Sequence, residues 1–302
     1  MTGAGFGARL REWRRRRGFS QLALSLLAQV SARHLSWLES DKASPSRAMV
    51  LRLAEQLDVP LRERNAWLEA AGYAALYAEH AWGEPACAEA RAAVQRLLDA
   101  HEPFPALAVD RGWQLVAHNR MVPLLIGALA PTLAQPPVNV LRLSLHPEGL
   151  APHIDGLADW RHHVLSRLER QIRHGGDAAL QALHEELRKL PPPAGHPPWP
   201  AHGAHDAHPE PGDRPRAPSD VAVPLKLRSP FGTLNFITTL TVFGAPRDIT
   251  LSELAIETLL PADAATGEAL RQIRAQAVEA VSDAGPRPAG PGARRTASVA
   301  NP

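Results

Sequence analysis

Cysteine is almost absent from this chain of 302 residues, where Cys87 is the only thiol. One cysteine cannot close an internal disulfide, and no Cys-x-x-Cys pair is present to hold a structural zinc ion. Proteins of a reducing cytosol show this usage, and the N-terminal segment has no apolar run of the kind that forms a signal peptide. We therefore expect a cytoplasmic protein.

Long apolar runs are also scarce. The longest stretch without a charged residue extends from Met121 to Leu141 and has the length of a membrane-spanning helix. Proline removes a backbone hydrogen-bond donor and interrupts a helix, and this stretch contains Pro123, Pro131, Pro136 and Pro137. The sequence therefore predicts no membrane span.

The short motifs of common enzyme classes are missing as well. The chain contains no nucleophile elbow, no His-Glu-x-x-His pair, no phosphate-binding loop and no dinucleotide-binding fingerprint. Glu185 and Glu186, together with scattered histidines, could form a hydrolase site, but no motif supports that interpretation. We expect no enzymatic activity and no cofactor.

The net charge of +2 is small, but the charge is unevenly distributed. Residues 1 to 52 contain ten arginines and lysines against Glu12, Glu39 and Asp41, a local balance of +7 that leaves −5 for the rest of the chain. Concentrated positive charge favours nucleic acid as a partner, because each neutralised phosphate releases condensed counterions. The alternative is a solvated basic face without a partner.

Two short helices separated by a tight turn are predicted between Gly18 and Pro45. Ser20 can cap the first helix, since its hydroxyl can accept a hydrogen bond from one of the N–H groups that a helix start leaves unpaired. Ser31 can cap the second helix, in which Leu35 and Leu38 share one face. The other face is small, polar and cationic, and such a helix fits a DNA major groove, which is about 12 Å wide. On periodicity alone, an ordinary helical hairpin inside a bundle remains the alternative.

The residue identities favour DNA binding. The segments GFSQLAL, VSARHLSWLE and SDKASPS, in this order, resemble the helix-turn-helix of the XRE or Cro/C1-type regulators. That family usually has glycine in the turn, where this chain has Gln29. Either a left-handed backbone there costs on the order of 1–2 kcal/mol, or the turn is wider. Asp41 replaces a second usual glycine and tolerates the left-handed region better than most residues.

The resemblance implies double-stranded DNA as the partner. Arg33 is the expected base reader, because an arginine near the start of a recognition helix can make a bidentate pair to guanine. Gln21 and Ser31 are expected to position the domain on phosphates at helix starts. One helix reads only a few base pairs, so a homodimer is expected. The DNA-binding candidates are Gln21, Ser31, Ala32, Arg33, Ser36, Trp37, Lys42, Ser44 and Ser46.

Patterns typical of β-strands begin after residue 102. Apolar runs on either side of Asp110-Arg-Gly predict a β-hairpin, and a second hairpin is predicted from Val221 to Phe243. Helices are expected between the two hairpins. These elements predict an α+β domain in which helices pack on one face of an antiparallel sheet, and the resulting cupped shape can hold a small molecule.

Residues 191 to 218 are rich in proline and poor in apolar residues, so we expect a disordered loop. Its histidines could gather a transition metal ion, although nothing in the sequence fixes their geometry. They are His196, His202, His205 and His208. A metal sensor or a zinc-dependent enzyme built on this loop is therefore an alternative function. A scaffold or antitoxin that uses the helix-turn-helix for protein contacts is another.

Four blocks of the C-terminal region resemble a second family: PFPALAVDRGWQLVAHNR, PPVNVLRLSLHPEGL, LADWRHHVLSRLERQ and VPLKLRSPFGTLNFITTLTVFGAPRDITLSELAIETLLPADAAT. They are similar to the ligand-binding domain of MmyB-like transcription regulators, which is PAS-like. The resemblance implies a regulator that responds to a small, largely apolar effector. The candidate effector-binding residues are His118, Asn119, Arg142, Arg170, Phe236 and Leu240.

The expected organisation is thus a chain of two domains, an all-α repressor-like helix-turn-helix domain and an α+β PAS-like domain. We expect the helix-turn-helix domain at residues 1–72 and a helical connector at residues 73–102. The PAS-like domain is expected at residues 103–282, followed by a disordered tail at residues 283–302.

Overall fold

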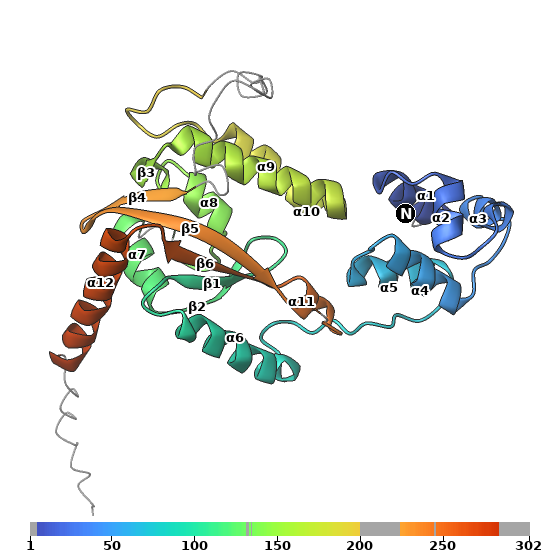
Figure 1. The fold of residues 1–302 in the computed structure, drawn as a ribbon, viewed down its shortest axis with the longest axis horizontal. Helices are drawn as coiled ribbons and strands as arrows, with labels where there is room; N and C mark the ends of the chain where they lie inside the picture. Colours follow the sequence, from blue (N-terminus) through green and yellow to red (C-terminus); the bar gives the residue numbers. More distant parts are fainter. Residues whose placement is uncertain (1–4, 131–132, 134, 200–223, 245, 284–302) are drawn as a thin grey trace, which may run out of the picture.

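Two regions of different architecture form the molecule. The computed structural model describes residues 5–130, 133, 135–199, 224–244 and 246–283. Figure 1 shows a bundle of short helices beside a larger part in which helices surround a curved sheet. The expected fold class, an all-α helix-turn-helix domain followed by an α+β domain with an antiparallel sheet, is confirmed.

Short helices build the N-terminal region: α1 (Phe6–Arg16), α2 (Gln21–Leu27), α3 (Ala32–Glu39), α4 (Arg47–Gln56) and α5 (Leu61–Ala70). Ser20, Ser31 and Ser46 cap α2, α3 and α4, because each hydroxyl accepts a hydrogen bond from a backbone N–H of the first turn. The apolar faces meet in one core, which includes Phe6, Leu10, Trp13, Leu24, Leu35, Leu38, Leu53 and Trp67.

The turn between α2 and α3 is tight and left-handed. Gln29 itself has φ = 54°, so the alternative of a wider turn is wrong. Asp41 has the same φ after α3, and its Oδ1 accepts a hydrogen bond from the Gly7 N–H at 3.0 Å. A Cβ on residue 7 would collide with the Leu38 carbonyl. The close approach of α1 to α3 therefore requires glycine at this position.

The C-terminal region contains an antiparallel sheet of β1 (Ala106–Val109), β2 (Leu115–His118), β3 (Ile154–Asp155), β4 (Leu225–Ser229), β5 (Gly232–Val242) and β6 (Ala255–Pro261). The strand order is β2-β1-β6-β5-β4-β3. The hairpin predicted at Asp110 joins β1 to β2, and Asp110 Oδ1 accepts hydrogen bonds from the N–H groups of Gly112 and Gln114. The longest strand, β5, pairs with β6 along its C-terminal half.

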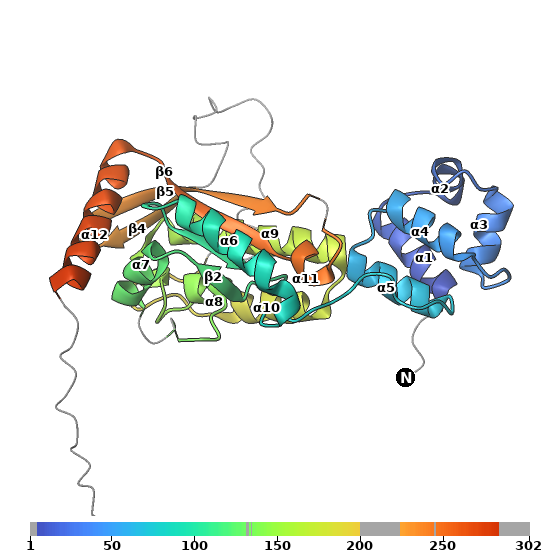
Figure 2. The ribbon, with the colours of Figure 1, turned by 90° about the horizontal axis from the view of Figure 1, so that it is seen from below.

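Helices cover both faces of this sheet. One face packs against α7 (Met121–Leu129), α8 (Val140–Leu145), α9 (Leu157–Gly175), α10 (Ala178–Lys189) and α12 (Ala264–Asp283), and residues of these helices share a core with Leu107 and Phe236. On the opposite face, Val94 and Leu98 of α6 (Ala88–Ala100) pack against Ala106 and Ala108. Figure 2 shows α6 lying across that side of the sheet. The expectation of helices on one face is wrong for α6, because all four residues of β1 are buried.

Three short helical segments connect these elements. Pro85–Cys87 and Ala151–His153 form 3-10 turns before α6 and β3, and α11 (Ile249–Ser252) lies between β5 and β6. None of the helices in the described part of the chain combines the length and the apolar character that crossing a membrane requires.

The proline-rich segment is partly packed. Pro193 is buried, and the Trp199 indole N–H donates a hydrogen bond to the Leu190 carbonyl at 2.8 Å. The guanidinium carbon of Arg161 lies 4.7 Å from the centre of the Trp199 ring. Trp199 therefore packs the first part of the expected loop, residues 191–199, against α9 and the end of α10. The remainder of the expected loop, with His202, His205 and His208, and the expected tail from residue 284 lie outside the described residues.

Candidate DNA-binding face and ligand site

The third helix presents a polar and cationic face to solvent. Leu35 and Leu38 point into the core of the bundle, whereas Ala32, Arg33 and Trp37 are exposed. The remaining candidates follow the same division, since Ser31, Lys42, Ser44 and Ser46 are exposed and Ser36 and Gln21 are half-buried. The DNA-binding candidates thus lie on the accessible side of α3 and the segments that flank it.

Arg33 is positioned by its neighbour one turn along. The guanidinium carbon of Arg33 lies 4.5 Å from the centre of the Trp37 ring. A cation over the face of an indole is attracted by the ring quadrupole, by about 0.5–1 kcal/mol at an exposed site. Arg33 itself is exposed, so its N–H groups can still reach a base or a phosphate.

A buried ion pair fixes the orientation of α3 behind this face. Glu39, whose side chain is 1% exposed, accepts two hydrogen bonds from the Arg14 guanidinium, and the bond from Nη2 measures 2.9 Å. The Gln21 amide donates a third hydrogen bond to Glu39 at 2.8 Å. Burial by itself raises the pKa of Glu39, but the bonds from Arg14 and Gln21 prevail and the pKa is lowered. One carboxylate therefore ties α1, α2 and α3 together.

Sequence reasoning missed this triad. Arg14 is one of the ten cations that give residues 1 to 52 their positive charge, yet it lies in the core, and Arg17 donates to the Leu57 and Asp58 carbonyls. Gln21 was assigned to phosphate contacts, and its amide is already shared with Glu39. The available signal was the position of Glu39, which follows Leu38 and lies one turn after Leu35 on the apolar side of α3.

Three of the six candidate effector-binding residues have structural partners. Asn119 is buried, and its side chain makes four hydrogen bonds that join α6, β1 and the start of α7. Arg142 donates to both carboxylate oxygens of Glu186 at 2.6 and 2.8 Å, which lowers the pKa of Glu186. Phe236 is fully buried in the core. These side chains are used by the fold.

The other three candidates are more accessible. His118 and Arg170 are exposed on different elements, β2 and α9, and the His118 ring nitrogen Nδ1 lies 3.0 Å from the Asn119 carbonyl oxygen. Leu240 is 44% exposed on β5. Leu240 also lines the cleft described next, and the other five candidates lie outside its lining.

A cleft of about 660 Å³ opens between the helix bundle and the sheet, and we call it the interdomain cleft. The bundle contributes Arg17, Pro60 and Arg62 to its wall. The other wall comes from the end of β5, the start of β6 and the turn between α9 and α10. The two domains therefore share this space.

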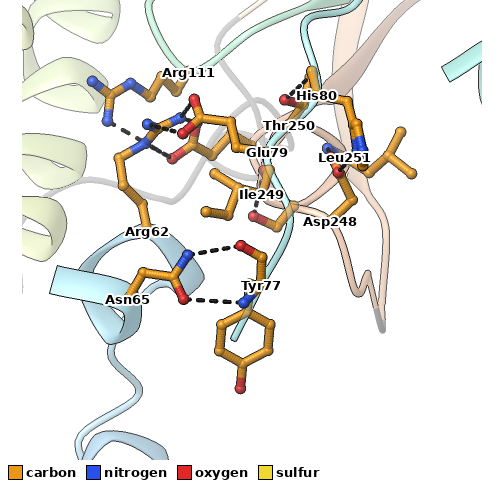
Figure 3. A network of polar contacts seen from close by, with 12 residues as sticks. Arg62, Asn65, Tyr77, Glu79, His80, Arg111, Asp248, Ile249, Thr250 and Leu251 are labelled. Atoms are coloured by element: carbon orange, nitrogen blue, oxygen red, sulfur yellow. Dashed lines mark hydrogen bonds and ion pairs between the residues drawn. The ribbon is translucent and has the colours of Figure 1, made fainter. Parts of the chain in front are cut away.

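Arg62 of α5 bridges the domains beside the cleft. Its guanidinium donates to both oxygens of Glu253, at 2.8 and 2.9 Å, and to both oxygens of Glu79, at 2.8 and 2.6 Å (Figure 3). The bond to Glu253 outweighs burial and raises the pKa of Arg62. Arg111 approaches Glu253 at 3.7 Å. Two arginines thus share one carboxylate, which follows α11 directly.

No metal site emerges from the part of the chain that the structure describes, since it contains no group of three or more histidine, cysteine or acidic side chains that could hold an ion. His196 has its ring nitrogen Nδ1 at 3.2 Å from the Pro197 carbonyl oxygen.

Comparisons with known proteins agree with both halves of the fold. Residues 6–67 match the family model of a helix-turn-helix domain. Residues 90–273 match the family model of the MmyB-like transcription regulator ligand binding domain. No curated protein matches the chain.

Proposed function

The chain belongs to the family of MmyB-like transcription regulators, and from this premise we propose that α3 reads operator DNA under the control of a small effector. The protein is a DNA-binding transcription regulator with a C-terminal ligand-binding domain. The proposal adds which residues read DNA, a homodimeric state, an effector of largely apolar character and the cytoplasmic location that the cysteine usage predicts. It includes no catalytic step.

The observation that carries the DNA-reading role is the exposed position of Arg33 on α3. Trp37 holds the guanidinium over its ring, and Glu39 fixes the helix on which both side chains stand. A bidentate pair from such an arginine to guanine discriminates against the wrong base by about 1–3 kcal/mol. Lys42, which is exposed on the loop after α3, offers a point charge that suits a phosphate.

Substituting the two cations separates base reading from phosphate binding. Arg33→Ala should remove the preference for one base pair in each half-site, because the lost contact discriminates between bases. Lys42→Ala should instead weaken binding to all sequences by the same factor and reduce the salt slope by about one counterion. Binding is measured on the operator and on a set of its single-base variants over a range of salt concentrations. Equal loss on every sequence in Arg33→Ala would reassign that residue to the DNA backbone.

A homodimer is part of the proposal because one short helix contacts too few base pairs to select one genomic site. Two copies related by a twofold axis would place their α3 helices about 34 Å apart, on half-sites one helical turn from each other. We expect a footprint with two symmetric half-sites and a dimer in sedimentation. A monomer that protects a single asymmetric site would contradict this.

The effector is proposed to act by binding the DNA-competent and incompetent states with different affinities. A coupling free energy of about 1–3 kcal/mol is usual, and DNA must change effector affinity by the same factor. Mass spectrometry of small molecules that co-purify with the protein identifies candidates. Operator affinity that is identical with and without such a molecule would leave the C-terminal domain without an effector role.

A further inference from the structure

The interdomain cleft has the size of a small-molecule site. Its volume of about 660 Å³ lies within the roughly 300–1,000 Å³ that is usual for such sites. Next to the cleft, the space between the sheet and its helices is filled by buried side chains such as Leu234 and Phe236. The cleft is therefore a space that an effector can enter without displacing the core.

Two exposed apolar side chains form the floor of this cleft. Leu240 and Val242 are 44% and 62% exposed, and both line the cleft. Residues two apart on a strand face the same side, so they continue the face on which Phe236 is fully buried. Ile237, on the opposite face of β5, is 40% exposed and does not line the cleft. The floor thus exposes apolar surface to water, and a ligand that covers this surface would be stabilised by the hydrophobic effect.

The charges around the cleft are already matched. Its arginines each have a carboxylate within 4 Å: Arg17 with Asp58, Arg62 with Glu253, Arg111 with Asp177 and Arg167 with Glu257. A charged ligand would lose its hydration without gaining an uncommitted partner among these groups, and burying a charge without a partner is costly. The chemistry of the wall therefore favours an uncharged ligand.

We propose that the effector of the proposed function binds in the interdomain cleft and is an uncharged, largely apolar small molecule that packs on Leu240 and Val242. This proposal rests on the proposed function and names the site and ligand class. A molecule seated there contacts both the bundle and the connection from β5 to β6, on which Glu253 holds Arg62. Occupancy therefore changes how the DNA-binding helices are held relative to the sheet.

The probe for this site is Nile red, an uncharged apolar dye whose emission increases in apolar surroundings. We expect saturable binding to the full-length protein. Leu240→Gln and Val242→Gln should weaken it at least tenfold, because they replace the apolar floor by amides. Ile237→Gln is the matched control, since it makes the same kind of change at similar exposure on the other face of β5, and it should leave binding unchanged. The thermal unfolding midpoints of the three variants show that each is folded.

Two further measurements test the ligand class and the regulation. 8-Anilinonaphthalene-1-sulfonate, an apolar dye with one negative charge, should bind at least tenfold more weakly than Nile red. Saturating Nile red should change the operator affinity of the wild-type protein about fivefold or more, and this change should be absent in Leu240→Gln.

The cleft is not the site if Leu240→Gln binds Nile red with the affinity of the wild type. The same conclusion follows if the wild-type protein shows no saturable binding of Nile red. Equal affinity for the two dyes would overturn the ligand class. In either case, salt-dependent operator binding and a co-purified molecule that shifts it would still support the proposed function. If the wild-type protein showed no salt-dependent DNA binding, the proposed function itself would be wrong, and with it the proposal that rests on it.

Discussion

Glu39 is the residue on which the DNA-reading face depends most. Its carboxylate accepts hydrogen bonds from Arg14 on α1 and Gln21 on α2 while it belongs to α3. Removing one partner of a buried pair leaves the other charge uncompensated, which typically costs about 3–5 kcal/mol. The packing of the three helices around the reading face is therefore sensitive to the charge of a single side chain.

This sensitivity predicts how stability depends on pH. The pKa of Glu39 is lowered in the folded protein from its ordinary value of 4.5. Its contribution to stability is then fully present above pH 4.5 and is lost as the pH falls through the lowered folded pKa, where both states become protonated. Urea unfolding from pH 7 to pH 3 should show this loss in the wild type. Glu39→Gln should be less stable by about 3 kcal/mol at pH 7 and show a flatter dependence.

Glu12→Gln is the control for this experiment, because Glu12 pairs with Arg16 at 2.6 Å on the surface and its side chain is 62% exposed. A surface pair of this kind contributes little. A pH dependence that is the same in Glu39→Gln and in the wild type would show that other groups dominate acid unfolding.

At the scale of elements, the turn between α2 and α3 carries strain. Gln29 occupies the left-handed region at φ = 54°, where a side chain costs on the order of 1–2 kcal/mol. The Gln29 backbone N–H still donates to the Leu26 carbonyl, and the following Val30 N–H donates to the Ser25 carbonyl. The turn is thus closed by its own hydrogen bonds, and the strain falls on residue 29 alone.

Gln29→Gly should therefore stabilise the protein by about 1 kcal/mol, the strain relieved less the entropy that glycine adds to the unfolded chain. Gln29→Ala removes the same side-chain atoms beyond Cβ without relieving the strain, and it should bring no such gain. The measurement is the free energy of unfolding in urea for the three proteins. A gain of the same size in both variants would mean that the glutamine side chain, and not the backbone, is the cause.

On the scale of the whole molecule, the connection between the domains is held at several points. Asn65 of α5 accepts a hydrogen bond from the Tyr77 N–H group (Figure 3) and another from the Leu76 N–H group. The Ile249 N–H donates to the Ala78 carbonyl, and the His80 ring nitrogen Nδ1 lies 2.8 Å from the Asp248 carboxylate. The connecting segment therefore runs along α11, between the bundle and the sheet, and the Arg62 pair closes the same joint.

Breaking the Arg62 pair should loosen this joint while the bundle keeps its own core. Arg62→Gln removes the guanidinium that Glu79 and Glu253 share, so we expect faster proteolytic cleavage between residues 73 and 84 and a weaker response of operator affinity to the effector. Arg64→Gln is the control, because Arg64 donates to the Val59 carbonyl within the bundle. Cleavage rates that rise equally in both variants would show that the change acts on α5 and not on the joint.

Local patterns in the sequence were sufficient to predict the helices and the turn of the helix-turn-helix. Ser20, Ser31 and Ser46 act as caps through residues three positions away, and Leu35 and Leu38 share a face because of helical spacing. These interactions lie within one helical turn, so a short segment contains all the information that they need. The alternating and apolar runs of the hairpin at Asp110 are local in the same sense.

The remaining features depend on partners that are distant in the sequence. Glu39 could be recognised as buried from its position, but its pairing with Arg14 arises only when α1 packs on α3, 25 residues away. The assignment of Asn119 and Phe236 to an effector site came from residue type, and the structure uses both inside the fold. The cleft requires Arg62 and Glu253, 191 residues apart, to meet across two domains. Short segments of the sequence therefore suffice to predict the local elements and the families. Tertiary packing sets which polar groups are buried, which face of β1 receives α6 and where a ligand can enter, because each of these depends on long-range contacts.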